Sequence, residues 1–297
     1  MNKKNANVLS EVALKQYSVA NRMNRFWAII IYTTLIAWTM FSVCALVWII
    51  LTSFKTNKEL YAGVWALPKG LHFENYIKAW SVVNLGRYFF NSIIVTSLAI
   101  FALTFLCTPA AYVLSRFNFK GRGFINNLII LGMGIPYQLL LIPLYKIFLD
   151  IKLADNIFGL TLVYIVLSIP FTIYLLSGFI RSLPSELEQA ALIDGCSEYG
   201  VFWKVIFPLS QPGVLAAAIF NFIFLWNEYM LALVFLPSSQ NKTISLGLYS
   251  IQSAMQYTAD WTGLFAAVVI VMMPTIILYF ILSEKVMTGI TLGAVKG

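Results

Sequence analysis

The sequence has little charge. Asp, Glu, Lys and Arg together make up only 11% of the 297 residues, whereas 60% of the residues are hydrophobic. A water-soluble domain of this length would need far more charge to cover its surface. The composition therefore excludes an ordinary soluble protein and is typical of a chain that crosses a membrane several times.

The chain also lacks the residues for disulfide, metal or nucleotide chemistry. Cys44, Cys107 and Cys196 show no Cys-x-x-Cys spacing, and we interpret all three as free thiols. His72 is the sole histidine, so a zinc site has no second histidine to draw on. No Gly-Lys dipeptide occurs, which excludes a Walker A loop, and neither His-Glu-x-x-His nor Gly-x-Ser-x-Gly is present. We expect no catalytic residue, no metal and no cofactor bound by this chain.

Long uncharged windows are what the sequence does contain. Six windows without Lys, Arg, Asp or Glu are long enough for the roughly 20 residues that a membrane-spanning helix needs. They cover residues 26–54, 88–115, 123–145, 156–180, 205–227 and 261–283. The fifth is expected to start near Pro212 and to continue past Glu228 to about Leu236. Because backbone groups in lipid must bond within their own segment, the sequence predicts an all-α polytopic protein with six transmembrane helices.

The basic residues outside these windows indicate the orientation. Arg116, Lys120 and Arg122 crowd a short loop between the second and third windows, where the positive-inside rule counts most. This loop, and with it both termini, is predicted to be cytoplasmic. The net charge of +8 is spread over membrane flanks and requires no nucleic-acid partner.

The same reasoning divides the chain into parts. These are a cytoplasmic N-terminal tail (1–25), a first transmembrane helix with an outer loop (26–87), a core of five helices (88–284) that contains a cytoplasmic loop (181–208), and a cytoplasmic C-terminal tail (285–297). The first window is not expected to be a cleaved signal peptide, because about 25 residues precede it and no small-residue cleavage site follows it.

The loop at 181–208 has an ordered polar pattern. Ser185 and Glu188 have the spacing of a capping box, which starts a helix. The residues expected to share one face of that helix are Leu187, Ala190, Ala191 and Asp194. The alanines leave room for the close approach of another surface.

The end of this helix is also marked. Gly195 is placed to cap the helix in a left-handed conformation, and a second helical stretch over 197–205 is expected to run to Pro208 and break there. Such a helix-turn-helix bracket is too short to be stable alone in water, so it needs a groove on a partner. The alternative is an ordinary amphipathic loop lying on the membrane surface.

The bracket resembles the coupling loop, or EAA loop, of binding-protein-dependent ABC importers. That loop reads Glu-Ala-Ala, three residues, Gly, and then an Ile-x-Leu-Pro-like stretch, which 189–195 and 205–209 match here. Gln189 stands where the family has Glu, so any salt bridge to the ATPase becomes a neutral hydrogen bond or passes to a neighbour. The resemblance implies that the ATPase-coupling residues are Glu186, Leu187, Glu188, Gln189, Ala190, Ala191, Asp194, Gly195, Phe202 and Pro208.

Further motifs extend the resemblance over about residues 88–297 and are similar to those of carbohydrate importer permeases of the maltose-type class. They are Asn91-Ser92, the Ala-Ala-Tyr-Val-Leu-Ser-Arg segment at 110–116, Gly134-Ile135-Pro136, Leu141-Ile142-Pro143-Leu144, Trp226-Asn227-Glu228-Tyr229 and the tail 288–297. In the tail, the resemblance implies ATPase contacts at Gly289, Gly293, Lys296 and Gly297, and glycines that let the tail run extended.

The resemblance implies a type I ABC importer permease fold and a division of labour. The expected partners are a second homologous permease subunit, two ATP-binding cassette subunits that use ATP and Mg, an extracellular solute-binding protein, and a sugar substrate. The chain itself is then a transport subunit of a bacterial cell membrane, not an enzyme.

Polar side chains within the windows are expected to mark the translocation path, because they are costly in lipid. They are Asn91, Gln138, Asn221, Asn227 and Glu228, and Trp226 is added to them as an aromatic platform for a sugar ring. The asparagines could equally join helices to one another, and an aromatic residue such as Trp226 is often an interface anchor rather than a platform for a sugar ring.

Three rival functions stay open at this point. An ABC importer for an amino acid or a polyamine is the nearest alternative. An ion-coupled secondary transporter usually shows repeated halves, which the six windows lack. A cation channel would need a filter and often an Arg-rich fourth span, and 156–180 has neither.

Overall fold

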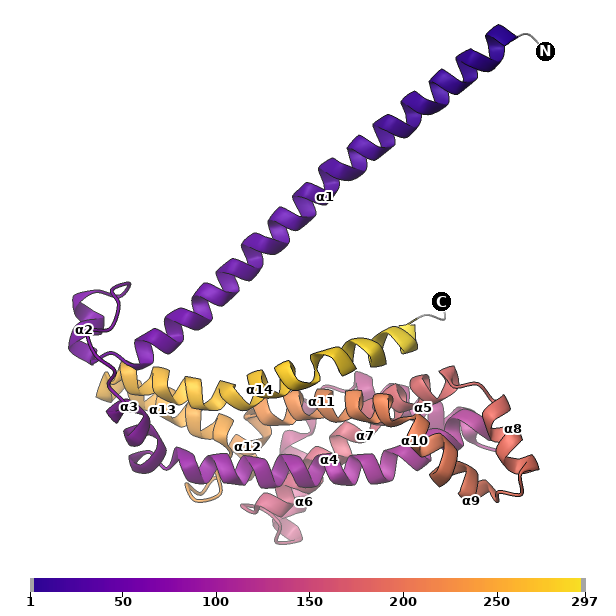
Figure 1. Ribbon diagram of the computed structural model, residues 1–297. Coiled ribbons are helices and arrows are strands. Elements are labelled where there is room, and N and C mark those ends of the chain that lie inside the picture. Colours follow the sequence, from indigo (N-terminus) through magenta and orange to yellow (C-terminus); the bar gives the residue numbers. More distant parts are fainter. Residues whose placement is uncertain (1–2, 295–297) are drawn as a thin grey trace. The chain divides into compact units, whose positions relative to one another are not determined.

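The computed structural model describes the backbone of residues 3–294 and the side chains of residues 27–254 and 257–282. All secondary structure in this range is helical (Figure 1). The chain divides into two compact units, residues 1–72 and residues 73–297. The fold class expected from the sequence is confirmed.

The first unit consists of one long helix and a folded loop. Helix α1 (Lys3–Ser53) carries a candidate span over Trp27–Ser53. Helix α2 (Asn57–Ala62) begins with a capping box, in which the Thr56 side chain accepts from the Glu59 backbone and the Glu59 carboxylate accepts from the Thr56 N–H. The Lys55 ammonium is buried and donates to the carbonyl oxygens of residues 63 and 64, which fastens the loop after α2 to the end of α1.

The second unit holds the remaining helices. They are α3 (Glu74–Ile77), the π-helix η1 (Lys78–Val82), α4 (Leu85–Arg116), α5 (Arg122–Gly134), the 3₁₀-helix η2 (Tyr137–Leu140), α6 (Leu141–Asp150), α7 (Ile157–Ser182), α8 (Glu186–Ile193), α9 (Glu198–Val201), the π-helix η3 (Phe202–Ile206), α10 (Phe207–Leu209), α11 (Gln211–Asn227), α12 (Met230–Phe235), α13 (Ile244–Thr258) and α14 (Trp261–Ala294). The long helices α4 and α7 pack along each other at the centre, and α11 packs on both of them and on α14.

The six expected spans appear as four long apolar helices and two bent pairs within the described range. The long helices are Trp27–Ser53, Leu85–Arg116, Ile157–Ser182 and Trp261–Leu282. The third window is not one helix: α5 and the run Tyr137–Asp150 meet at 91°. The break falls at Ile135 and Pro136, both of which have extended backbone. Pro136 has no N–H to continue the ladder and disfavours helix at the residue before it.

The fifth window also differs from the expectation. Helix α11 ends at Asn227, Glu228 takes an extended conformation, and α12 begins again at Met230. The Glu228 carboxylate is buried and accepts from the backbone N–H groups of Leu231 and Ala232, so it satisfies the free donors at the start of α12. An acidic residue in this window therefore divides the helix, which is why the predicted continuous run to Leu236 is wrong.

Two further expectations about the end of the chain need correction. The loop before the last span contains helix α13, which we did not predict. The tail was expected to run extended, yet α14 continues as a helix through Gly289 and Gly293 to Ala294. Lys296 and Gly297 lie outside the described residues.

Candidate coupling site and solute path

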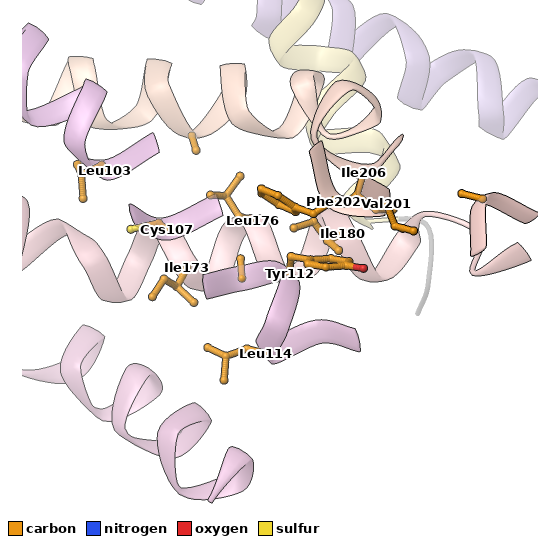
Figure 2. Close-up of a cluster of buried hydrophobic side chains, with 13 residues drawn as sticks. Leu103, Cys107, Tyr112, Leu114, Ile173, Leu176, Ile180, Val201, Phe202 and Ile206 are labelled. Carbon is orange, nitrogen blue, oxygen red and sulfur yellow. The ribbon is translucent and has the colours of Figure 1, made fainter. Parts of the chain in front are cut away.

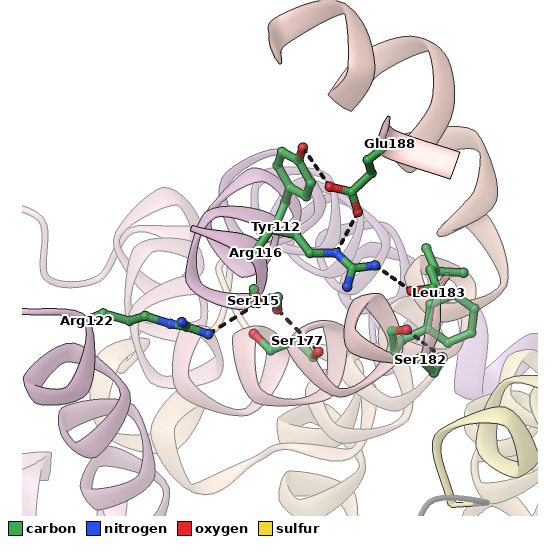
Figure 3. Close-up of polar contacts among 9 residues, drawn as sticks. Tyr112, Ser115, Arg116, Arg122, Ser177, Ser182, Leu183 and Glu188 are labelled. Carbon is green, nitrogen blue, oxygen red and sulfur yellow. Dashed lines mark hydrogen bonds and ion pairs between the residues drawn. The ribbon is translucent and has the colours of Figure 1, made fainter. Parts of the chain in front are cut away.

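Helix α8 is tied to the ends of α4 and α7 by one arginine. The Arg116 Nε atom lies 2.6 Å from the Glu188 carboxylate of α8, and Arg116 Nη2 donates to the Leu183 carbonyl at 2.6 Å (Figure 3). The Tyr112 hydroxyl, one turn earlier on α4, donates to the same carboxylate at 3.4 Å. A guanidinium presents several donors in a fixed fork, so one side chain can hold two elements at once. Glu188 is thus paired within the chain.

A second arginine braces the turn between α4 and α5. Arg122 donates from Nε to the Leu114 carbonyl at 3.0 Å and from Nη2 to the Ser115 carbonyl at 3.2 Å. The Ser115 hydroxyl in turn donates to the Ser177 carbonyl of α7 at 3.3 Å (Figure 3). These bonds satisfy carbonyl groups that the last turn of α4 leaves free. The bundle end next to α8 is therefore cross-linked by polar contacts.

Beneath these polar contacts, an apolar cluster fixes the bracket of helices α8–α10. The second arm of the bracket consists of α9, η3 and α10. Its residues Val201, Phe202 and Ile206 are buried in the same cluster as Tyr112, together with Ala191 of α8 (Figure 2). The Phe202 ring lies 5.3 Å from the Tyr112 ring. Phe202, expected among the ATPase-coupling residues, is only 6% exposed, so it anchors the bracket from within.

The turn after α8 has the expected glycine geometry. Gly195 has a φ of +85°, its N–H donates to the Leu192 carbonyl, and the next N–H donates from Cys196 to the Ala191 carbonyl. These two bonds form a Schellman motif, which satisfies carbonyl groups at the helix end. The prediction of a left-handed cap at Gly195 is confirmed.

Two details of the predicted bracket are wrong. Ser185 has helical backbone angles, so the Glu188 N–H donates to the Ser185 carbonyl instead of to its side chain, and the Glu188 carboxylate is paired with Arg116. Pro208 does not break the second arm. The preceding turn widens to a π-helix, with the Phe207 N–H donating to the Phe202 carbonyl, and helix continues to Leu209. The 66° bend between this arm and α11 falls at Ser210.

The residues predicted to share one face of α8 do not share one environment in the structure. Ala191 is buried, since it lies three residues after Glu188 and points to the same side, whereas Leu187, Ala190 and Asp194 are exposed. The other exposed residues of the predicted loop site are Glu186, Gln189, Gly195 and Pro208. Ile193 is 86% exposed and Tyr199 is 83% exposed, although sequence reasoning named neither. The bracket thus presents a mixed polar and apolar surface away from the bundle.

Four of the six residues expected along the path form hydrogen bonds with a different segment of the chain, and Asn227 donates to the Ile223 carbonyl of its own helix. Asn91 donates to the carbonyls of Gln240 and Lys242, and Asn221, which is buried, donates to the Thr172 hydroxyl. The other two are Trp226 and Glu228.

Trp226 and Glu228 are both buried. The Trp226 ring is 1% exposed, stacks on Phe222 and donates from Nε1 to the Val271 carbonyl at 3.0 Å, so it offers no face to a sugar. Glu228 accepts from the Tyr164 hydroxyl at 2.7 Å in addition to its cap bonds. These placements favour the alternative that polar residues within the spans join helices to one another. Of the expected path residues, Gln138 and Asn227 are exposed.

A cavity of about 590 Å³ opens between α5, α7 and α11, at the end of the bundle that carries α8. Most of its lining is apolar, and its polar members are Asn126, Tyr174, Ser177 and Arg181. This volume is in the range of sites for small molecules. None of the six expected path residues lines it. The cavity results from helices that meet only in the fold, so the polar-residue criterion could not locate it.

The architecture and the bracket can be compared with known proteins. A model of the family "Binding-protein-dependent transport system inner membrane component" matches residues 105–286, which is more than half of the chain. The chain belongs to this family. The members of this family are membrane components of binding-protein-dependent transport systems, and they are not enzymes. Because a secondary transporter or a channel does not belong to such a system, both rival classes are excluded.

Individual relatives agree with this assignment. The permease is 33% identical to the diacetylchitobiose uptake system permease protein NgcG of Streptomyces coelicolor, over 92% of its own length and 90% of that protein's. It is 37% identical to the sulfoquinovosyl glycerol transport system permease protein SmoH of Agrobacterium fabrum, over 84% and 88% of the two chains. A chain of a bacterial ABC transporter that imports alginate has the same fold, with a TM-score of 0.75 at 24% identity over 89% of the permease and 97% of that chain.

Proposed function

We propose that this permease forms one half of the channel of an ATP-driven ABC importer for a sugar or an oligosaccharide. It pairs with a second homologous permease, two ATP-binding cassette subunits and an extracellular solute-binding protein. The observation that carries the proposal is the bracket of helices α8–α10. Its inner side is fixed to α4 and α7 through Arg116 and Phe202, and its outer side is exposed.

The exposed side of the bracket suits a docking surface for the ATPase. Leu187, Ala190 and Ile193 offer apolar contact, and Glu186 and Asp194 offer negative charge to basic groups of a partner. Because α8 is short, a groove on the ATPase would stabilise it further. The bound nucleotide and Mg belong to that partner, and this chain binds no cofactor in the proposal. The C-terminal residues Gly289, Gly293, Lys296 and Gly297 are proposed as a second contact with the ATPase.

This proposal fixes an orientation for the chain. The bracket must lie in the cytoplasm for an ATPase to reach it, so both termini are cytoplasmic and the loop containing α13 is external. The basic residues Arg116, Lys120 and Arg122 then lie on the cytoplasmic side, in agreement with the positive-inside rule. The cavity between α5, α7 and α11 then opens on the cytoplasmic half, and we propose it as the inner part of the solute path.

The mechanism in this proposal is alternating access. A loaded binding protein docks on the external loops, and the ATPases close on ATP and displace the bracket. Because the bracket is anchored to α4 and α7, the displacement moves these helices and opens the path outward. ATP hydrolysis then resets the assembly. Breaks at Pro136, Ser210 and Glu228 divide two of the spans into shorter rigid pieces that can turn separately.

The sugar class is supported by relatives named for diacetylchitobiose and sulfoquinovosyl glycerol uptake. An importer for an amino acid or a polyamine is the alternative. Purification of the tagged chain from its native membrane, with mass spectrometry of the associated proteins, tests the proposal. We expect a Walker-type ATPase, a second permease and a binding protein that shifts its melting temperature with sugars. A homo-oligomer without an ATPase would refute the importer, and a binding protein that responds only to amino acids would refute the sugar.

A further inference from the structure

We infer that Arg116 and Glu188 form an internal clamp that carries the displacement of α8 to α4 and α7, so that Glu188 acts within the permease and not on the ATPase. This inference rests on the proposed function and changes the role of one residue that the resemblance assigned to the ATPase contact. In this division of roles, the exposed residues of α8 receive the movement and Arg116 with Glu188 transmit it.

Three elements of the fold meet at the Arg116 guanidinium. Arg116 belongs to the last turn of α4, Glu188 to α8, and Leu183 to the segment between α7 and α8. The contacts of Arg116 with the Glu188 carboxylate and the Leu183 carbonyl are both 2.6 Å long (Figure 3). Displacement of α8 by a partner therefore moves α4 directly through a side-chain contact, and not only through the backbone that joins α7 to α8.

The Arg116–Glu188 pair is largely shielded from solvent. The side chain of Arg116 is 16% exposed and that of Glu188 is 14% exposed, so water screens the pair little. The Nε and Oε1 atoms of this ion pair have no hydrogen-bond partner among the described residues, so removing either charge leaves the other buried and uncompensated. By comparison, the ion pair between Lys78 and Asp260 at the opposite end has its lysine 55% exposed. A stiff link is what the transmission of a displacement requires.

The polar neighbours of Glu188 on α8 face away from the bundle. Glu186 and Gln189 are exposed, and Gln189 occupies the position of the family's glutamate. Successive residues of a helix are rotated by about 100°, so they cannot share the inward side with Glu188. The acidic group next to the expected ATPase contact is thus already engaged with Arg116.

Tyr112 connects the clamp to the second arm of the bracket. Its hydroxyl donates to Glu188 at 3.4 Å, and its ring lies 5.3 Å from the ring of Phe202. Both arms of the bracket consequently contact one turn of α4. We regard Tyr112, Arg116 and Glu188 as positioning residues, because none of them faces the cavity.

A double-mutant cycle in the complete importer tests the clamp. The variants are Glu188→Gln, Arg116→Gln and the pair together, with Glu186→Gln as a contrasting variant that removes an equivalent charge from the proposed docking surface of α8. The readout in proteoliposomes is the number of ATP molecules hydrolysed per solute imported, together with the amount of ATPase that copurifies. A purely structural role would lower the yield of both activities without changing their ratio.

We expect Glu188→Gln to retain the ATPase and to raise the ATP consumed per solute by about tenfold, while Glu186→Gln, on the proposed docking surface, lowers the amount of ATPase that copurifies. In the Arg116→Gln background, Glu188→Gln should change the ratio by less than about twofold, because residues that act as one unit are non-additive. If Arg116→Gln does not assemble, Arg116→Lys, which keeps the charge and loses the fork, provides the same comparison.

Two results would overturn the clamp. One is loss of the copurifying ATPase in Glu188→Gln, which would place Glu188 in the subunit contact. The other is an equal effect of Glu188→Gln in both backgrounds. Absence of any ATP-dependent uptake with the wild-type chain would instead refute the proposed function, and the clamp with it.

Discussion

Replacement of Gly195 should damage coupling through backbone strain alone. Gly195 has a φ of +85°, and a Cβ atom added there would meet no atom within 4 Å. A clash therefore plays no part, and the cost is that of an L-residue in the left-handed region, about 1–2 kcal/mol. We expect Gly195→Ala to lie at the lower end of this range and Gly195→Val, whose branched side chain suits this region least, at the upper end.

This backbone strain acts on α8, a helix that is only marginally stable. A helix of eight residues has little stability of its own, so the strain lowers the ratio of folded to unfolded α8 by about 5- to 30-fold. Gly195→Asn should cost least, because asparagine tolerates the left-handed conformation better than other side chains. The order of defects is therefore predicted to be Asn, then Ala, then Val.

The assay is solute-stimulated ATP hydrolysis and uptake by the reconstituted importer. Gly123→Ala is the matched control, because Gly123 is helical and also has open space around the position of a Cβ. We expect this control to keep full activity, since alanine favours a helix over glycine. Wild-type uptake and ATPase binding in Gly195→Val, or equal defects in the Asn and Val variants, would refute the role of the left-handed cap in coupling.

Three further predictions concern stability. Trp226→Ala should lower it by about 3–5 kcal/mol and Trp226→Phe by about 1 kcal/mol, as thermal unfolding in detergent would measure, because the ring is buried and donates one hydrogen bond. The Thr56 N–H holds the pKa of Glu59 below its usual 4.5, so the α2 cap should persist above that pH and be lost as the pH falls through the lower folded value. Pepsin cleavage of α2 should show this, and Glu59→Gln should abolish the pH dependence. Lys55→Met should speed chymotrypsin cleavage of the loop after α2, because the Gly63 and Val64 carbonyls lose the ammonium donor and keep only the Ala66 N–H and Trp48 Nε1.

Hydrophobicity alone located the spans, but it did not show where they break. A segment in lipid must satisfy its own backbone bonds, so an uncharged window of sufficient length is nearly obliged to be helical. The third window nevertheless breaks at Pro136, whereas Pro109 and Pro170 lie inside continuous helices. Whether a proline breaks a helix depends on whether neighbouring helices hold its two halves in line, and no local pattern records that.

The sequence also indicated the bracket and its left-handed glycine, since both follow from residue types a few positions apart. Glycine is the residue that adopts a φ of +85° without strain, so Gly195 could be recognised from its place after a short helix. The folded chain alone decided that Glu188 turns inward. Its partner, Arg116, lies far away in sequence and indicated only the orientation of the chain and the end of the 110–116 motif.

The residues expected along the solute path also show that sequence patterns do not reveal contacts between distant segments. Trp226 and Glu228, both expected along the path, have partners within the chain, namely the Val271 carbonyl and the Tyr164 hydroxyl. The cavity lies instead among α5, α7 and α11, where its lining is mostly apolar. The sequence by itself determined the class of protein, the spans and the bracket, because these depend on local composition and spacing. The tertiary structure decided which side chains face inward, pair with one another or line a cavity, because those properties depend on contacts between segments that are distant in the chain.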